Sequence, residues 1–518
     1  MPVLLTLDQG TTSSRTLAFD ARGRLLASSQ KTIAQTYPRP GWVEEDPEEI
    51  FTSQLDTLQD VLIQLRNRHA IKPGQIAGVG ITNQRETIVV WDRLTGQPVY
   101  PAIVWQCRRT TEICTRLREA GHEALIQQKT GLVLDAYFSA TKWMWLFEQD
   151  PALRQRAEKG EVLAGTIDTW LIWRLTAGRC HITDVSNASR TLLMNLLTGQ
   201  WDDELLTLFG IPQPMLPQIV PSAGRFGMID PSLVPGGLVL AGLAGDQQAA
   251  LFGQACFAPG LTKNTYGTGC FMLMQTGRQP VFSQHGLLAT VAWDLGTGLQ
   301  YALEGSVFNA GSAIQWVRDE LGLIDSAPDI DRLAAQVPDT AGVQVVPAFT
   351  GLGAPYWDMH TRGLICGITR GTNKAHIARA VLESIAQQSQ DVLELMQQEA
   401  GFAIPALRVD GGASVSDLLM QLQADISQIP VDRPAMTETT AFGAAALAGY
   451  GLGLWPSLDR IAALRQQGQL FFDVLCKDLF SSCCVKITIT SKPLIERKKE
   501  NTLSLTSNSS EKPFNCFS

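Results

Sequence analysis

One segment near the start of the chain combines the residue types that handle phosphate groups. It reads DQGTTSSR over residues 8–15 and directly follows an apolar run. Gly10 permits close backbone approach, and hydroxyl and N–H groups beside a cationic side chain can contact phosphate oxygens. Asp8, at a strand end, can hold a hydrated Mg²⁺. The candidate phosphate contacts are Thr11, Thr12, Ser13 and Arg15. Taken alone, the segment could equally be an ordinary polar hairpin turn.

Two later segments have the same glycine-rich character. The run LTKNTYGTGCFMLMQTG, residues 261–277, repeats the order of strand, glycine-and-hydroxyl turn and strand, and Thr268 in its turn offers a second grip for phosphate. Farther along, an apolar strand runs into the pair Gly411-Gly412, where a flat adenosine can lie. An isolated strand-to-helix turn would look the same, so the segments are informative mainly in combination.

Asp246 is the candidate general base. It lies in AGDQQAALFG, between a predicted strand and a predicted helix. At a seam between two domains, a carboxylate in this position can take a proton from a substrate hydroxyl. Aspartate is also a favoured helix N-cap, and both interpretations can hold at once.

Arg85 and Glu86 form an adjacent cation and anion in a loop between two predicted strands. Such a pair can donate to and accept from neighbouring hydroxyls of a polyol. The alternative is a solvated pair on the surface, which carries no chemistry.

The elements that must hold these residues alternate between strands and helices. Strands are predicted over residues 3–7, 16–20, 76–82 and 87–92, and helices over 139–149 and from Lys374 to Gly401. Another helix is expected to begin after Asp46, with Pro47 in its first turn and Glu49 completing a capping box. This mixture indicates an α/β protein.

The two strand–turn–strand hairpins, about 260 residues apart, suggest two similar halves that face one another. The boundary is expected near residues 250–260, where AGDQQAALFG ends. Two halves of this kind would enclose a cleft between their phosphate-binding turns.

Composition limits the classes of partner. The chain has 518 residues, of which 45% are hydrophobic, so a sizeable core is available. The formal net charge of −8 argues against a nucleic-acid or anionic-membrane binder that relies on bulk charge. The sequence contains neither GxxxxGK[ST] nor GxGxxG, so a P-loop and a Rossmann dinucleotide site are not supported.

The location of the protein is predicted from features that the sequence lacks. The start, MPVLLTLDQG, lacks the features of a signal peptide, and the cysteines form no CxxC pair, which fits the reducing cytoplasm. The longest uncharged stretch, 439–458, is rich in glycine and is interpreted as a close-packed helix followed by a loop, not as a membrane span.

Many long motifs in one order resemble the glycerol kinases of the FGGY carbohydrate kinase family, which are related in fold to actin and hexokinase. They include DQGTTSSR, GWVEEDP, GITNQRET, WQCRR, TDVSNASRT, AGDQQAALFGQ, KNTYGTGCFML and PAFTGLGAPYWD. YFSATKWMWLFEQ and GLICGITRGTNKAHIARAVLE resemble the two family signatures. The resemblance runs from about Leu4 to about Leu470. It implies two ribonuclease-H-like α/β domains, of the actin and hexokinase type, flanking a catalytic cleft.

The resemblance also implies a set of site residues. Asp246 would be the general base, and Asp8 would position Mg²⁺ through water. The residues implied to bind glycerol are Arg85, Glu86, Tyr137, Asp246 and Gln247, with Trp105 and Phe271 as an apolar wall. The residues implied to contact the nucleotide are Thr11, Thr12, Ser13, Arg15, Thr268, Gly311, Gln315 and Gly412.

The domains expected from this comparison are residues 1–252, with the glycerol site and the first phosphate loop, and 253–470, with the nucleotide site. Residues 471–518 are expected to form an atypical, partly disordered tail, although Leu470, Phe471, Val474, Leu475 and Leu479 retain helical spacing. Four residues after Gly412 the family usually has Asn, which contacts adenosine, whereas this chain departs from that pattern with Ser416.

The expected function is ATP-dependent phosphorylation of glycerol to sn-glycerol 3-phosphate, by a cytoplasmic enzyme that uses ATP and Mg²⁺ and forms a homodimer or homotetramer. One alternative is another sugar or polyol kinase of the same family. A second is a non-catalytic actin-like nucleotide switch, against which the presence of both Asp8 and Asp246 argues. A third is a folded kinase impaired by its tail.

Overall fold

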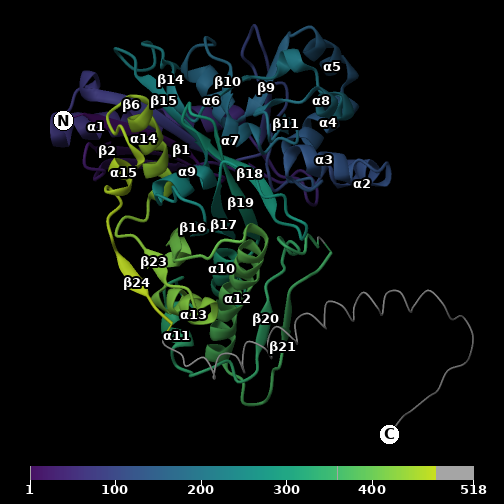
Figure 1. Ribbon diagram of the computed structural model, residues 1–518, viewed down its shortest axis with the longest axis vertical. Helices are drawn as coiled ribbons and strands as arrows, with labels where there is room; N and C mark the ends of the chain where they lie inside the picture. Colours follow the sequence, from purple (N-terminus) through teal and green to yellow (C-terminus); the bar gives the residue numbers. More distant parts are fainter. Residues whose placement is uncertain (1, 359, 474–518) are drawn as a thin grey trace, which may run out of the picture.

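The computed structural model describes residues 2–358 and 360–473, which form two lobes (Figure 1). The first lobe is built on a mixed sheet of order β14-β15-β6-β1-β2-β3. Its strands are β1 (Val3–Gln9), β2 (Ser13–Asp20), β3 (Leu25–Thr32), β6 (Ile76–Asn83), β14 (Ala223–Met228) and β15 (Val239–Gly245). Every residue of β1 is buried, which explains why the strand begins with an apolar run over residues 3–5. Its later polar residues, Thr6, Asp8 and Gln9, are buried as well.

The second lobe is built on a sheet of order β18-β19-β17-β16-β22-β23-β24. Its strands are β16 (Thr262–Tyr266), β17 (Cys270–Gly277), β18 (Leu288–Asp294), β19 (Leu299–Val307), β22 (Leu407–Asp410), β23 (Val431–Arg433) and β24 (Gln469–Phe471).

The two sheets share their central pattern. In the first, β1 is antiparallel to β2 and parallel to β6, which is parallel to β15. In the second, β16 is antiparallel to β17 and parallel to β22, which is parallel to β23. The prediction of two similar halves, each opened by a hairpin, is therefore confirmed.

A smaller sheet of order β4-β5-β8-β7-β9 extends the first lobe. It consists of β4 (Gln35–Thr36), β5 (Glu44–Glu45), β7 (Ile88–Asp92), β8 (Ala102–Ile103) and β9 (Val162–Thr166). The remaining strands pair as β10 (Ile182–Asp184) with β13 (Gln218–Val220), β11 (Met194–Asn195) with β12 (Gln200–Trp201), and β20 (Gln344–Val346) with β21 (Leu364–Cys366).

Helices cover the faces of the sheets. Those of the first lobe are α1 (Pro47–His69), α2 (Thr111–Glu119), α3 (Glu123–Thr130), α4 (Ser139–Gln149), α5 (Pro151–Glu158), α6 (Ile167–Leu175), α7 (Val185–Ala188), α8 (Asp203–Phe209) and α9 (Asp246–Gly253). Those that follow are α10 (Gly311–Asp319), α11 (Asp329–Ala334), α12 (Lys374–Ala400), α13 (Asp417–Ser427), α14 (Thr439–Gly451) and α15 (Leu458–Ala462). Short 3₁₀ turns span Pro73–Gln75, Gln213–Met215 and Gly412–Val415.

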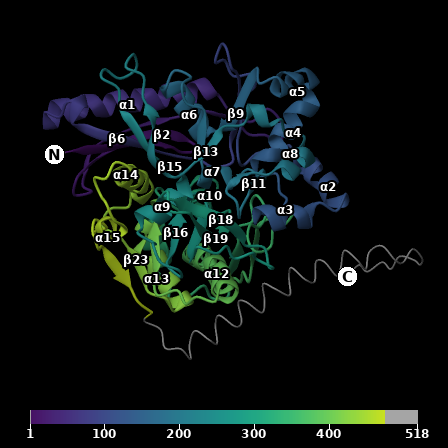
Figure 2. The ribbon, with the colours of Figure 1, turned by 45° about the horizontal axis from the view of Figure 1, so that its top comes forward.

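Helix α14 comes late in the sequence but packs on the first lobe, beside α9 and against β1, β6 and β15 (Figures 1 and 2). Glycines allow the contact, since a Cβ on Gly443 would lie 1.8 Å from the carbonyl oxygen of Ala249, and one on Gly253 would lie 2.0 Å from that of Thr439. The chain therefore returns to the first lobe after building most of the second. The uncharged stretch 439–458 is the close-packed helix and following turn that its composition predicts.

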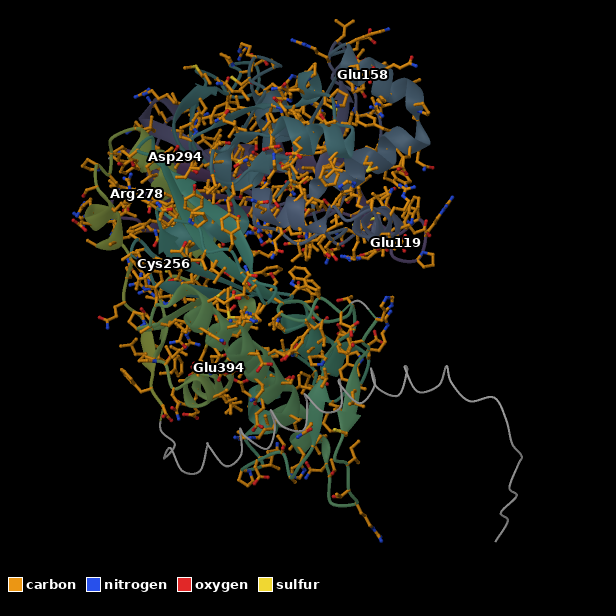
Figure 3. The ribbon with its side chains drawn as sticks, turned by 45° about the vertical axis from the view of Figure 1, so that its right-hand side comes forward. Glu119, Glu158, Cys256, Arg278, Asp294 and Glu394 are labelled. Carbon is orange, nitrogen blue, oxygen red and sulfur yellow. The ribbon has the colours of Figure 1, made fainter. Side chains whose placement is uncertain are left out.

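An apolar cluster joins the two lobes. It contains Leu4 and Phe19 of the first sheet, Leu273 and Trp293 of the second, and Phe442 of α14. Cys256 belongs to the same cluster and lies between the lobes in Figure 3. The cluster fixes the relative position of the β1–β2 hairpin (the first hairpin) and the β16–β17 hairpin (the second hairpin).

Two local predictions need correction. Helix α1 begins as expected, with the Asp46 carboxylate accepting from the Glu48 N–H, but no capping box forms, because Glu49 accepts instead from the N–H of Ala34. The predicted helix at Leu470 and Phe471 is wrong, because both residues lie in β24 and pair with β23. Val474, Leu475, Leu479 and the rest of the tail lie outside the described residues.

Candidate functional site

Arg85 is the centre of a cluster between the lobes. It lies in the loop between β6 and β7, and its side chain is buried. Its Nε is 3.3 Å from the Asp246 carboxylate, and its Nη2 donates to the Tyr137 hydroxyl at 3.4 Å. Glu86 is buried as well. A solvated surface pair is therefore the wrong interpretation of Arg85-Glu86.

Asp246 is the first residue of α9, whose N-cap is Gly245. The predicted N-cap role is therefore wrong by one position, although the carboxylate still accepts from the backbone N–H of Gln247 at 2.7 Å and from the Gln247 side-chain amide at 3.0 Å. The Asp246 side chain remains 32% exposed, so a substrate hydroxyl can approach it. Burial raises the pKa of Asp246 above its ordinary value, opposed by Arg85 and Lys263. A half-buried carboxylate of this kind can act as a proton acceptor.

Aromatic rings line one side of the cluster. The Trp105 ring meets those of Tyr137 and Phe271 edge to face, with centroids 5.6 and 6.1 Å apart. The Trp105 indole N–H also donates to the Thr11 hydroxyl at 3.0 Å. This hydrogen bond connects the aromatic wall directly to the turn of the β1–β2 hairpin.

The first hairpin turns tightly between β1 and β2, where the Gly10 N–H donates to the Ser13 carbonyl at 2.9 Å. Thr12 at its tip is exposed, and the Ser13 hydroxyl accepts from the Gln30 amide at 3.1 Å. Asp8 pairs with Arg15, which also contacts Glu438 at 2.8 Å. Burial raises the pKa of Asp8, and Arg15 opposes this shift. Thr11 is thus bonded to the aromatic wall, whereas Thr12 and Ser13 have no hydrogen bond to the cluster around Arg85 among the described residues.

The second hairpin contacts the start of α10. The Gly311 and Ser312 N–H groups donate to the carbonyls of Gly267 and Thr268 at 3.0 and 3.1 Å. A Cβ on Gly311 would lie 2.5 Å from the Gly267 carbonyl oxygen, so only glycine permits this approach. The hairpin and the N-terminus of α10 therefore form one rigid unit.

Beside this unit lies a cavity of about 430 Å³. It brings together four of the predicted nucleotide residues, namely Thr268, Gly311, Gln315 and Gly412. Its apolar lining includes Ile314, Ile330 and Ala413. Nothing lies within 4 Å of the position that a Cβ on Gly412 would take, so this wall is bare backbone. The volume and lining suit a flat heterocycle with a polar edge.

Ser416 lines the same cavity, but its hydroxyl already forms two hydrogen bonds within the protein. Its hydroxyl accepts from the Leu419 N–H at 3.0 Å, which caps α13, and donates to the Asp331 carboxylate at 2.6 Å. The hydroxyl proton is therefore already used, so Ser416 can donate to a ligand only by giving up its bond to Asp331, whereas its second lone pair can still accept a hydrogen bond.

Three charged residues at the site were not singled out from the sequence. Lys263, in β16, is fully buried and donates to the side-chain oxygen of Gln247 and, at 2.9 Å, to the Thr265 hydroxyl. Arg190 and Glu304 are fully buried too and pair with one another at 2.9 Å. Glu304 is an acidic residue inside the apolar strand YALEGSV, a signal that could have marked it.

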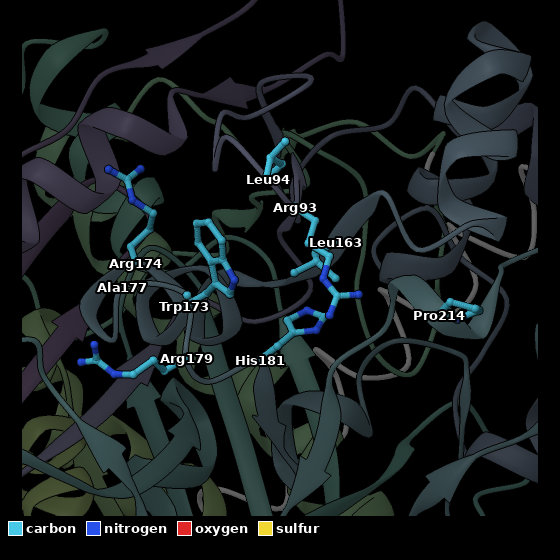
Figure 4. A pocket seen from close by; sticks show the side chains of 10 residues that line it. Arg93, Leu94, Leu163, Trp173, Arg174, Ala177, Arg179, His181 and Pro214 are labelled. Atoms are coloured by element: carbon cyan, nitrogen blue, oxygen red, sulfur yellow. The ribbon is translucent and has the colours of Figure 1, made fainter.

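A larger cavity, of about 590 Å³, lies in the first lobe away from these residues (Figure 4). Its lining includes Arg93, Trp173, Arg174, Arg179 and His181. Arg174 pairs with Glu48, and Arg179 pairs with Asp230 at 2.6 Å. Burial lowers the pKa of His181 to about 4, so this imidazole is neutral at pH 7. Much of the positive charge around the cavity is therefore already balanced.

Two features that are absent from the described part of the chain bear on other functions. None of its helices has both the length and the apolar composition needed to cross a membrane. It also contains no cluster of three or more His, Cys, Asp or Glu side chains arranged to hold a metal ion.

Comparison with protein families matches both lobes. The N-terminal domain of the FGGY family of carbohydrate kinases matches residues 3–253, and the C-terminal domain matches residues 262–452. The chain belongs to the FGGY family of carbohydrate kinases. This assignment agrees with the two-lobed α/β fold and with the resemblance carried by the sequence motifs.

Individual members of the family resemble the chain closely. Glycerol kinase 2 of Thermotoga maritima is 55% identical over 471 residues, which cover 91% of this chain and 94% of that protein. The crystal structure of Plasmodium falciparum glycerol kinase with ADP superimposes with a TM-score of 0.87 at 36% identity, over 96% of this chain and 98% of that one. A ligand-bound xylulose kinase from Lactobacillus acidophilus superimposes with a TM-score of 0.82 at 24% identity, over 98% of this chain and 99% of that one, which is a likeness of fold alone.

Proposed function

We propose that this protein is an enzyme that phosphorylates glycerol with ATP and forms sn-glycerol 3-phosphate. The observation that carries the proposal is the position of Asp246, a half-buried carboxylate 3.3 Å from Arg85 and held on its other side by Gln247. Two glycerol kinases that are 55% and 56% identical to the chain over 471 and 458 residues support the choice of substrate.

The cluster around Arg85 suits a small neutral substrate. We call it the polyol cluster; its members are Arg85, Glu86, Tyr137, Asp246, Trp105 and Phe271. Arg85 can donate to one hydroxyl and Glu86 can accept from the next, while Trp105 and Phe271 cover the carbons. Arg85 and Arg190 are balanced by Glu86 and Glu304. Because no cationic charge in this group is left uncompensated, a sugar acid has little electrostatic advantage over glycerol. This argument favours a triol over gluconate.

Transfer would occur between the two hairpins. The cavity beside Thr268, Gly311, Gln315 and Gly412 would hold the nucleoside, and Thr11, Thr12, Ser13 and Arg15 would contact the phosphate oxygens. Asp246 would accept the proton of the attacking hydroxyl as it approaches the γ-phosphorus in line with the leaving oxygen. Such transfer depends mainly on positioning and on stabilisation of charge.

Magnesium fits this arrangement as a partner of the nucleotide. Mg²⁺ usually takes one or two carboxylates together with phosphate oxygens and water, and Asp8 supplies a buried carboxylate next to the first hairpin. The metal supplies neutralisation of phosphate charge. Asp8 would orient it through water, and Arg15 would move from Asp8 towards the phosphates.

Three further proposals concern organisation. The predicted domains 1–252 and 253–470 would close over the cleft and exclude water during transfer, with α14 staying on the first lobe, against which it packs. The protein would act in the cytoplasm, as a homodimer or homotetramer. Sedimentation analysis of the purified protein tests the oligomeric state directly.

The decisive experiment is a coupled ADP-release assay with Mg²⁺, ATP and a panel of glycerol, D-xylulose and gluconate. We expect the highest kcat/KM for glycerol. A higher value for either other substrate would indicate a different kinase of the family. Nucleotide binding without acceptor-dependent ADP release would indicate a non-catalytic nucleotide switch.

A further inference from the structure

Glu304 connects the two lobes at the candidate site. It lies on β19 of the second sheet, and its side chain is fully buried. Its two carboxylate oxygens accept from Arg85 Nη1 at 2.5 Å and from Arg85 Nη2 at 3.1 Å. One of these oxygens also accepts from Arg190 Nη2 at 2.9 Å. A single carboxylate thus binds two arginines of the first lobe.

Arg190 carries the contact on to Glu86. Its Nε donates to a Glu86 oxygen at 2.6 Å, and its guanidinium lies over the rings of Phe138 and Tyr137, at 5.3 and 5.8 Å. Arg85, Glu304, Arg190 and Glu86 therefore alternate in sign, and Arg85 Nε closes the ring 3.9 Å from Glu86. We call these four residues the charge ring.

The charge ring has a geometric consequence. Replacing buried ion pairs with apolar side chains is often neutral or even stabilising. A gain in folding stability therefore does not explain why a buried ring of charges is present. A carboxylate that binds both terminal nitrogens of one guanidinium fixes the plane of that group. Glu304 thereby leaves Arg85 Nε directed at Asp246, 3.3 Å away.

We infer that Glu304 is a positioning residue for the polyol, which holds Arg85 directly and Glu86 through Arg190 in the orientation that binds neighbouring hydroxyls. This inference rests on the proposed function. Because Glu304 belongs to the second sheet and its partners to the first, the polyol site has its full geometry only when the lobes are in this relative position. A ligand that fits the site then favours that position.

The test compares Glu304→Gln with Glu304→Asp and with the double variant R190Q/E304Q, which keeps the number of positive and negative charges equal. Glu44→Gln is the matched control, because Glu44 is also buried and pairs with Arg109 at 2.8 Å. Each variant is assayed for the KM of glycerol, the KM of ATP, kcat and the melting temperature.

We expect Glu304→Gln and the double variant to raise the KM of glycerol about 10- to 100-fold, the range for losing a hydrogen bond to a charged group. The KM of ATP should change less than about threefold, and Glu304→Asp should recover part of the glycerol affinity. The control should leave both KM values near those of the parent protein.

A normal glycerol KM in a folded double variant would overturn the inference, even if Glu304→Gln does not fold. Equal increases in both KM values, together with a lower melting temperature, would also overturn it and assign Glu304 a structural role. Failure of the parent protein to phosphorylate glycerol would instead contradict the proposed function, so the two failures are distinguishable.

Discussion

Arg85 Nε lies 3.3 Å from the Asp246 carboxylate, so the cation expected to bind the polyol and the base expected to activate it are in direct contact. The two residues come from different parts of the first lobe, the loop after β6 and the start of α9. A hydroxyl bound by Arg85 would therefore lie next to the group that removes its proton. Because the two groups are in direct contact, a change in either one is expected to alter the other.

Asp246→Asn should lower kcat by about 10²- to 10⁴-fold, the usual contribution of a positioned general base. The amide keeps the size of the side chain and can still accept from the Gln247 N–H, so folding should be preserved. Steady-state kinetics and thermal melting of the same preparation check this expectation. A near-normal kcat, or a loss confined to melting temperature, would reduce Asp246 to a structural role.

Lys263→Met should move the acidic limb of the kcat–pH profile to higher pH. Asp246 must be ionised to act as a base, so activity falls as pH falls through its pKa. Burial raises that pKa, and Arg85 and Lys263 lower it. The other titratable groups that act on Arg85 are Glu86, Tyr137 and Glu304. Without the Lys263 charge, the pKa of Asp246 should be higher, so the acidic limb should move to higher pH.

Lys142→Met is the matched control for this pH profile. Lys142 is also fully buried, and burial lowers its pKa, like that of Lys263, to about 8. It donates to backbone carbonyls of Tyr137 and Phe138, not to Gln247. An unchanged limb in Lys263→Met, or an equal shift in both variants, would contradict a specific effect of Lys263 on Asp246.

Asp8→Asn should raise the Mg²⁺ concentration needed for half-maximal activity by about tenfold, because a neutral amide orients a hydrated cation less strongly than a carboxylate. The glycerol KM should change little, since Asp8 bonds to Arg15 and, in the part of the chain that the structure describes, has no hydrogen bond to the polyol cluster. Magnesium titrations at saturating glycerol and ATP measure the effect. An unchanged magnesium requirement would remove Asp8 from the proposed metal site.

Gly412→Val should weaken ATP binding without weakening glycerol binding. The Cβ at this position meets no atom within 4 Å, so the variant should fold, while its methyl groups would occupy space in the cavity of about 430 Å³. We expect the KM of ATP to rise at least about tenfold. Direct titration of glycerol provides the comparison, and an unchanged KM of ATP would place the nucleoside elsewhere.

Deletion of residues 482–518 should leave kcat and the glycerol KM within about threefold of the full chain, equivalent to less than about 0.7 kcal/mol. All candidate site residues lie between Asp8 and Ser416, upstream of the deleted segment. Side-by-side kinetics and soluble yields of the two proteins test this prediction. Lost activity in a truncated but folded protein would show that the segment takes part in closure or assembly.

Local patterns in the sequence were sufficient to predict much of the scaffold. Helix α12 spans Lys374–Ala400 and ends at Gly401, as its periodicity and its glycine predict. Strands β6 and β7 flank the loop that carries Arg85, as the apolar runs around NQRE predict. The error at Leu470 and Phe471 arose because helical spacing over a few residues cannot reveal the open edge of β23 with which they pair.

The sequence by itself determined the order of the elements, the two related hairpins and the chemical types of the candidate site residues, because these depend on residues close together in the chain. Only the tertiary structure decided which charges meet. Lys263 reaches Gln247, Glu304 reaches Arg85, and Glu304 is 219 residues from Arg85 in the chain. Pairing over such separations depends on how two sheets pack through a shared apolar cluster, which no local pattern specifies.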